Sequence, residues 1–146
     1  MIAGARALLA AAAIALAGCQ QLPLTPQDIE ARKFEAVPGA AVIYVVRDYP
    51  DFTELQSMIY LGDQVILKTY PGTYYRWEAP PGDHLIRGAA FDTGAIRLET
   101  VPGRIYFVQQ RVTAALMASP NSFFQLVSEP AGRGAVLRSV LLVPEP

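Results

Sequence analysis

The pattern of apolar and polar positions divides the chain into three parts. Residues 7–16 form an uninterrupted run of Ala, Leu and Ile, and a polar, proline-containing stretch follows it. From residue 40 onwards, short apolar or alternating runs are separated by turn-forming pairs such as Pro71-Gly72 and Pro102-Gly103. Alternation with a period of two is typical of β-strands, and Gly, Pro and Asp between the runs mark turns. The sequence therefore predicts a leader, a linking segment and a β domain.

Several runs in the third part have a clear β pattern. Residues 41–47 are continuously β-branched and aromatic, which predicts a strand buried on both faces. Residues 58–61 and 65–67 flank Gly62-Asp63-Gln64, which predicts a hairpin. Further strands are expected at residues 73–78, 84–88, 96–101, 105–111, 123–127 and 136–143. Short strands with turns about every 8 to 12 residues favour one all-β domain, residues 40–146, built as a single antiparallel β-sandwich of the immunoglobulin or transthyretin kind.

Two segments have helical features instead. Thr25-Pro26-Gln27-Asp28 combines an N-cap residue, a proline at the first helical position and an acid in the first turn. We expect a short helix at residues 26–35, with ordered coil as the alternative, inside a linking segment that spans residues 19–39. Residues 129–135 are the other segment with a helical pattern.

The apolar run near the start has the layout of a secretory signal. Arg6 precedes it, and small residues lead into Leu16-Ala17-Gly18-Cys19. A membrane-spanning helix would need about 20 apolar residues, and this run ends sooner, at Gln20. An ordinary secretory signal needs no cysteine, yet the single Cys of the chain stands where bacterial lipoproteins form a lipid thioether. The motif predicts a signal peptide at residues 1–18 and lipidation of Cys19.

The predicted lipid would attach the mature chain to a membrane. One acyl chain binds only marginally, whereas the two or three chains of bacterial lipoproteins give stable attachment. Gln20 follows the cysteine, and it differs from the Asp that favours inner-membrane retention in enteric-type bacteria. We therefore expect a cell-envelope protein on the periplasmic leaflet of the outer membrane.

Composition narrows the choice of partners and chemistry. The chain has 12 basic and 13 acidic side chains without a basic cluster, which argues against nucleic acid as a partner. With Cys19 lipidated, no thiol remains for a disulfide, so the fold must depend on its core. His84 is the single histidine, and a metal site needs several clustered ligands. We expect no metal, no cofactor and no catalysis, and we expect the His84 ring to bond a backbone group at the start of its strand.

Two groups of side chains are candidates for a binding surface. The densest aromatic group in the chain consists of Tyr70, Tyr74, Tyr75 and Trp77. Alternation places Tyr75 and Trp77 on one face of a strand and Tyr74 on the other. These rings either pack in the core or form an exposed strip for a sugar, a peptide or a partner strand. The second group lies in the least regular segment, a flap over the core or a loop open to a partner, and consists of Met117, Phe123 and Phe124.

The order of several motifs is similar to that in a known family. The motifs are Ile43-Tyr44-Val45-Val46-Arg47, Gly72-Thr73-Tyr74-Tyr75-Arg76-Trp77, Pro80-Pro81-Gly82-Asp83-His84 and Val101-Pro102-Gly103-Arg104-Ile105-Tyr106-Phe107-Val108. Across residues 40–142 the chain resembles bacterial lipoproteins of the domain-of-unknown-function 2846 group, whose β domain is similar to PEGA-type surface-layer modules. Val45 departs from the family pattern, which often has an aromatic residue two positions before the arginine. The resemblance implies a fold and a location, and it implies no established reaction.

These features favour a non-enzymatic lipoprotein that acts as an envelope accessory or protein-interaction module, held at the membrane by Cys19. The alternative is a lipoprotein that binds a small ligand, such as a sugar, a peptide or a lipid, in a pocket framed by residues 70–77 and 117–124. A single deep pocket lined by both segments would favour the alternative, whereas a flat apolar patch would favour the interaction module.

Overall fold

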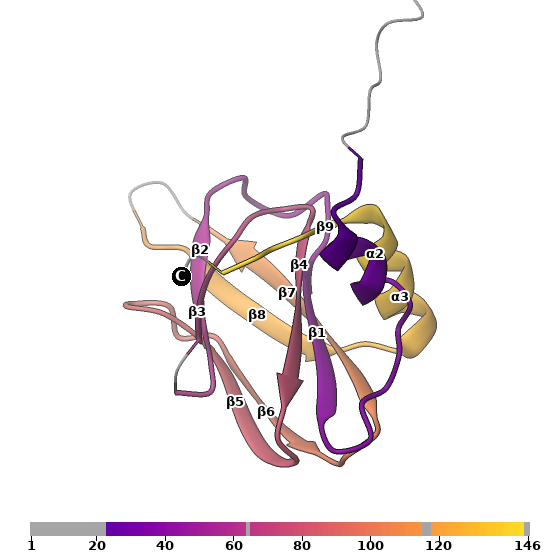
Figure 1. The fold of residues 1–146 in the computed structure, drawn as a ribbon. Coiled ribbons are helices and arrows are strands. Elements are labelled where there is room, and N and C mark those ends of the chain that lie inside the picture. Colours follow the sequence, from indigo (N-terminus) through magenta and orange to yellow (C-terminus); the bar gives the residue numbers. More distant parts are fainter. Residues whose placement is uncertain (1–22, 64, 115–117, 145–146) are drawn as a thin grey trace, which may run out of the picture.

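Two β-sheets packed face to face form the body of the protein (Figure 1). The computed structural model describes residues 23–63, 65–114 and 118–144. Sheet A has the strand order β8–β7–β1–β4–β9, and sheet B has the order β3–β2–β5–β6. The elements in chain order are α2 (Pro26–Ala31), β1 (Ala41–Arg47), β2 (Ser57–Leu61), β3 (Val65–Thr69), β4 (Thr73–Ala79), β5 (Gly82–Gly88), β6 (Ala95–Thr100), β7 (Ile105–Thr113), β8 (Asn121–Leu126), α3 (Glu129–Arg138) and β9 (Val140–Leu141). The prediction of an all-β sandwich is confirmed at this level, because the described part of the chain is mostly β, with 45% strand and 14% helix.

Strand β1 lies at the centre of sheet A, and all seven of its residues are buried. This confirms the prediction drawn from its continuous apolar run. Ile43 and Val45 face sheet B, whereas Val42, Tyr44 and Val46 belong to the core beneath the helices. The two faces of one strand thus contribute to two separate hydrophobic cores.

The sequence pattern predicts antiparallel pairing throughout, but two pairs of strands in sheet A are parallel. β1 pairs antiparallel with β4 but parallel with β7, and β4 pairs parallel with β9. After β1 the chain crosses to sheet B for β2 and β3, returns to sheet A for β4, crosses again to sheet B for β5 and β6, and enters sheet A once more at β7. β7 therefore enters beside β1 from the same end of the molecule, which makes the two strands parallel.

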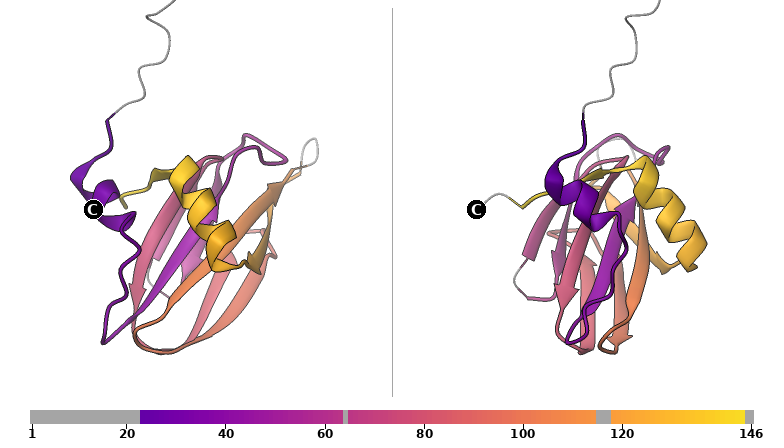
Figure 2. Two further views of the ribbon diagram at one scale, coloured as in Figure 1. Left: turned by 90° about the vertical axis from the view of Figure 1, so that its right-hand side faces the viewer. Right: turned by 45° about the vertical axis from the view of Figure 1, so that its right-hand side comes forward.

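The second core lies between sheet A and the helices. α2 and α3 cover the outer face of sheet A, as the turned views show (Figure 2). Tyr44 stacks on Phe107 with ring centroids 5.1 Å apart, and Phe34 is tilted against both rings. Gly132 lets α3 lie directly on Phe107, because a Cβ at position 132 would come within 2.2 Å of that ring. The protein therefore has three layers: helices, sheet A and sheet B.

The N-terminal helix is shorter than predicted. Thr25 caps it as expected, since its Oγ1 accepts a hydrogen bond from the Asp28 amide at 3.1 Å. α2 nevertheless ends at Ala31 and not near residue 35, because Phe34 adopts a φ of 53°, which a helix cannot continue through. Phe34 and Val37 pack into the helix-side core. The end of the linking segment therefore packs on the same core as the β domain.

The predicted last strand, residues 136–143, is wrong over most of its length. The helical features expected at residues 129–135 are confirmed, but α3 continues to Arg138. Ala135 and Val136 pack against sheet A from this helix, so they are unavailable to a strand. In the described chain, only Val140 and Leu141 then pair with β4.

None of the helices in the described ranges is both long and apolar enough to cross a bilayer. Residues 1–18 and Cys19 precede the first described residue. The predictions of a signal peptide and of lipidation therefore fall outside the described residues.

Candidate functional site

The aromatic residues predicted on and before β4 do not form one strip. Tyr74 is fully buried beneath the helices, while Tyr75 and Trp77 pack partly against the core between the sheets. The predicted alternation of faces is thus confirmed. Tyr70 lies apart on the turn before β4, where its hydroxyl donates a hydrogen bond to Gln56 Oε1 at 2.9 Å. The four aromatic rings therefore lie in three different environments and do not form the single exposed strip.

The second predicted group lies on another strand. Phe123 is exposed on β8, Phe124 packs partly between the sheets, and Met117 lies outside the described residues. β7 and β1 separate β8 from β4, which places about 14 Å between those two strands. The ligand pocket expected between residues 70–77 and 117–124 is therefore not formed by the described residues.

A hollow of about 430 Å³ surrounds His84. The His84 Nε2 lies 2.6 Å from the carbonyl oxygen of Pro80, which confirms the expected contact with a backbone group. The ring also meets Trp77 edge-on, with centroids 4.9 Å apart. The charged side chains of the hollow are Asp63, Asp83 and Arg97. An aromatic ring beside charged groups is suited to holding a polar ligand.

A larger groove, of about 520 Å³, runs beside β4. β9 pairs with the first two residues of β4 only, so residues 75–79 have an edge without a strand partner in the described chain. On this edge Tyr74 accepts a backbone hydrogen bond from Leu142 at 2.7 Å. Because backbone groups alternate in direction along a strand, Arg76 and Glu78 direct their N–H and C=O groups to the same edge. An unpaired strand edge is a template for another extended segment.

Carboxylates outnumber cations along this groove. Glu30, Glu35 and Glu78 line it, together with Arg76 and the ring of Tyr75. Burial acts to lower the pKa of Arg76, but the hydrogen bond and charge of Glu78 and the interaction with Tyr44 together outweigh burial, and the pKa is raised. Burial has the opposite effect on the Tyr75 hydroxyl, whose pKa it raises. The groove thus joins an open strand edge to an aromatic ring and an acidic rim.

A buried carboxylate fixes the helical wall of the groove. Asp28 is 2% exposed, and it accepts hydrogen bonds from Arg32 at 2.5 Å and from the Tyr74 hydroxyl at 2.7 Å. Burial alone would raise the pKa of Asp28, but these hydrogen bonds, a hydrogen bond from the Leu141 amide and the charge of Arg32 together outweigh it and hold the pKa below its ordinary value of 3.8. Arg32 also donates to the carbonyl oxygens of Leu137 and Ser139. The cluster ties α2 to β4 and to the end of α3.

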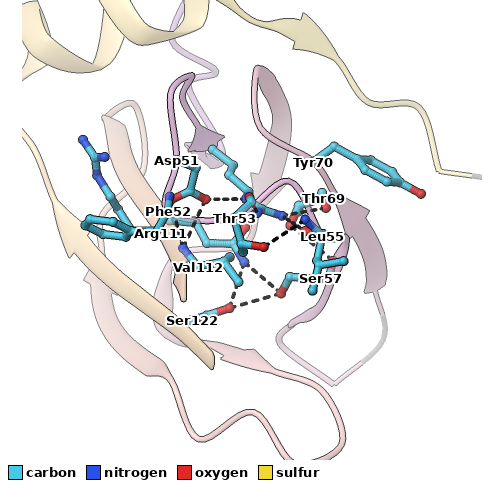
Figure 3. Close-up of polar contacts among 12 residues, drawn as sticks. Asp51, Phe52, Thr53, Leu55, Ser57, Thr69, Tyr70, Arg111, Val112 and Ser122 are labelled. Carbon is cyan, nitrogen blue, oxygen red and sulfur yellow. Dashed lines mark hydrogen bonds and ion pairs between the residues drawn. The ribbon is translucent and has the colours of Figure 1, made fainter. Parts of the chain in front are cut away.

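A second buried ion pair holds the long connection between β1 and β2 (Figure 3). The Arg47 side chain is fully buried, and its Nε lies 2.6 Å from Asp51 Oδ2. Asp51 in turn accepts a hydrogen bond from the Val112 amide of β7. The terminal nitrogens of Arg47 donate to the carbonyl oxygens of Thr53, Leu55 and Thr69. A buried guanidinium needs an opposite charge and hydrogen bonds to offset the loss of water, and here the connection itself supplies most of them.

The connection fixed by Arg47, residues 48–56, is called the apolar loop from here on because of what it exposes. Tyr49 is 61% exposed, Phe52 70% and Leu55 55%. The guanidinium of Arg111 lies over the Phe52 ring, 5.6 Å from its centroid. This loop is absent from the binding surfaces predicted from the sequence. A signal was present in the apolar residues at every third position, outside any predicted strand.

The described residues contain no group of three or more His, Cys, Asp or Glu side chains placed to hold a metal ion. Comparisons of the chain with family models, with curated proteins and with solved structures found no match. In the described residues, the features that could bind a partner or ligand are the groove beside β4, the hollow at His84 and the apolar loop.

Proposed function

We propose that this protein is a lipid-anchored, non-enzymatic accessory of the bacterial envelope that binds an extended segment of a protein partner. The observation that supports this most is the groove beside residues 75–79 of β4, where an unpaired strand edge lies between an aromatic ring and an acidic rim. Strand addition supplies main-chain hydrogen bonds, and side chains along the edge give selectivity. The acidic rim favours a segment that carries Lys or Arg.

The location is part of the same proposal. Leu16-Ala17-Gly18-Cys19 supports a lipid, with palmitate among its acyl chains, on Cys19, and Gln20 supports the periplasmic leaflet of the outer membrane. The resemblance to the domain-of-unknown-function 2846 lipoproteins belongs to the proposal as well. So does an immunoglobulin- or transthyretin-like topology, for which the two sheets packed face to face are the support.

In-cell photo-crosslinking tests the groove. A photo-reactive residue at Glu35, exposed on the rim, should capture one dominant envelope protein, whereas the same residue at Leu126, exposed on the far strand β8, should not. Tyr74 is unsuitable as a probe position because it is buried. Glu78→Pro removes an N–H that faces the open edge and not β1, so it should abolish capture while the sheet stays intact.

Two results would contradict this function. Equal capture at Glu35 and Leu126 would indicate collision and not a site. Capture that survives Glu78→Pro would exclude strand addition. Cys19→Ser serves as the control for the anchor, because this variant should no longer take up labelled palmitate.

The hollow at His84 favours a second candidate, a lipoprotein that binds a small polar ligand such as a sugar. Trp77 touches the His84 ring and lines the hollow. Because it is the single tryptophan of the chain, its fluorescence reports directly on any ligand bound there. A saturable fluorescence change with an envelope sugar, without capture at Glu35, would favour this candidate over the peptide-binding groove.

A further inference from the structure

We infer that the apolar loop, residues 48–56, enters the interface of the membrane that carries the lipid of Cys19. The inference rests on the proposed lipid anchor, and it goes beyond that anchor by assigning a second, non-covalent membrane contact to named side chains. The occupant of this surface is the lipid bilayer and not a protein.

The apolar loop lies at the end of the molecule where the described chain begins. Figure 1 shows the segment before α2 leaving the body at the end where β1 runs into the loop. Hydrogen bonds agree with the picture. Arg32, which follows α2, donates to the carbonyl oxygen of Ser139 at 2.7 Å, and the neighbouring Arg138 pairs with Asp48 of the loop at 2.7 Å. The N-terminal helix and the apolar loop are thus fastened to the same short segment.

The tether is too short to let another end of the molecule face the bilayer. Pro23, the first described residue, is four positions after Cys19 in the sequence. An extended chain spans at most about 3.5 Å per residue, so Pro23 lies within about 14 Å of the lipid-bearing residue. β1 alone, with seven residues, is about 23 Å long. The end that carries Pro23 and the apolar loop must therefore lie next to the membrane.

Exposed aromatic side chains gather at this end. In the described chain they are Tyr49, Phe52, Tyr70, Phe91 and Phe123. The first four lie in connections at the end where β1 finishes, and Phe123 is the third residue of β8, which starts there. The turns at the opposite end are rich in Gly and Pro, and the exposed large apolar residues there, Val101, Ile66 and Leu126, are aliphatic. Exposed apolar side chains gathered at one end favour an interaction surface there, and the ring and hydroxyl of a tyrosine such as Tyr49 suit the boundary between water and lipid.

The loop is held in shape before it meets any partner. The buried Arg47 binds the carboxylate of Asp51 and the carbonyl oxygens of Thr53 and Leu55, so the chain on both sides of Phe52 is held in place (Figure 3). A fixed loop loses little conformational entropy on binding. The guanidinium of Arg111 lies over the Phe52 ring, so a cation would accompany this ring to the membrane surface.

Fluorescence quenching measures whether the loop enters the bilayer. The lipidated protein is reconstituted in phosphatidylethanolamine–phosphatidylglycerol vesicles that contain lipids brominated on the acyl chains. In a Trp77→Phe background, Phe52→Trp and, separately, Tyr49→Trp report on the loop, and Val101→Trp is the matched control at the opposite end. We expect quenching at positions 52 and 49 to be several-fold stronger than at position 101. Absence of quenching at both loop positions, or equal quenching at all three, would overturn the inference.

The design separates this inference from the proposed function. Lipid attachment at Cys19 is verified first, by mass and by palmitate labelling. An unlipidated Cys19 would overturn the anchor, and this inference with it. A lipidated protein with unquenched loop probes would overturn this inference alone. If such a protein crosslinks from position 52 to an envelope protein in cells, the loop is a protein-docking surface instead.

Discussion

At the scale of single residues, two arginine–carboxylate pairs near the apolar loop differ sharply in their surroundings. Arg47 and Asp51 have side chains that are 0% and 1% exposed, whereas the side chain of Arg138, paired with Asp48, is 62% exposed. An exposed pair gains little because water and salt screen it. A buried pair contributes through what its removal leaves behind, an uncompensated charge and unsatisfied carbonyl groups.

Replacement of Arg47 should therefore be costly. We expect Arg47→Met to lower the free energy of unfolding by about 3–5 kcal/mol, because Asp51 is left buried without its cation. The matched variant Arg138→Met should leave the free energy of unfolding almost unchanged. Urea unfolding of both variants, compared with the unchanged protein, measures the difference.

A double variant checks the cause. Arg47→Met combined with Asp51→Asn removes the isolated charge, so it should recover part of the lost stability. If Arg47→Met proves no more harmful than Arg138→Met, the ion pair does not hold the loop in the way described.

At the scale of elements, α3 carries two glycines with different surroundings. A Cβ on Gly132 would lie 2.2 Å from the Phe107 ring, whereas a Cβ on Gly134 would meet only the end of the Arg138 side chain, at 3.3 Å. Gly132 is thus required for the close contact between α3 and sheet A. Gly134 has no such constraint, and glycine inside a helix is unfavourable relative to alanine.

Alanine at the two positions should have opposite effects. We expect Gly132→Ala to lower the free energy of unfolding by about 1–3 kcal/mol, because the helix must move off Phe107. Gly134→Ala should raise it by up to about 1 kcal/mol through helix propensity. Thermal and urea unfolding of the two variants test this. Stabilisation by both substitutions would mean that α3 does not pack on Phe107 as closely as described.

Alternation and turn residues were sufficient to predict most strands, because both signals depend only on residues that are close together in the sequence. The hairpin around Gly62 and the two buried faces of β1 are examples. The apolar residues from Ala135 to Leu141 fit a strand or a helix equally well on local pattern. The close approach of Gly132 to Phe107 favours the helix. The two residues are far apart in the sequence, so a local pattern cannot reveal this contact.

The candidate sites were predictable only in part, for a similar reason. Alternation correctly separated Tyr75 from Tyr74. The open edge beside Tyr75, however, exists because β9 pairs with two residues of β4, which is a property of the sheet. The exposure of Phe52 likewise depends on Arg47, and an arginine at the end of a strand has the same sequence signature whether it is buried or solvated.

At the scale of the whole molecule, the short tether and the apolar loop lie at the same end of the protein, and both would hold that end at the membrane. Removal of one large apolar side chain from water contributes about 1.5–3 kcal/mol when burial is complete. A flexible tether gives an effective concentration on the order of millimolar, and a dissociation constant of about 1 mM corresponds to about 4 kcal/mol. Burial of two side chains of the loop would therefore suffice to keep a tethered domain on the bilayer.

A longer tether separates the two contributions. Insertion of ten Gly and Ser residues between Gln21 and Leu22 would allow the domain to leave the surface. Because the loop supplies its own affinity, we expect quenching of Phe52→Trp by brominated lipid to persist in this variant. Adding Tyr49→Ser and Leu55→Ser to the long-tether protein should abolish quenching, whereas the same two substitutions on the short tether should reduce it only partly. If the intact loop loses quenching when the tether is lengthened, the tether alone holds this end at the membrane, and the loop contributes no affinity of its own.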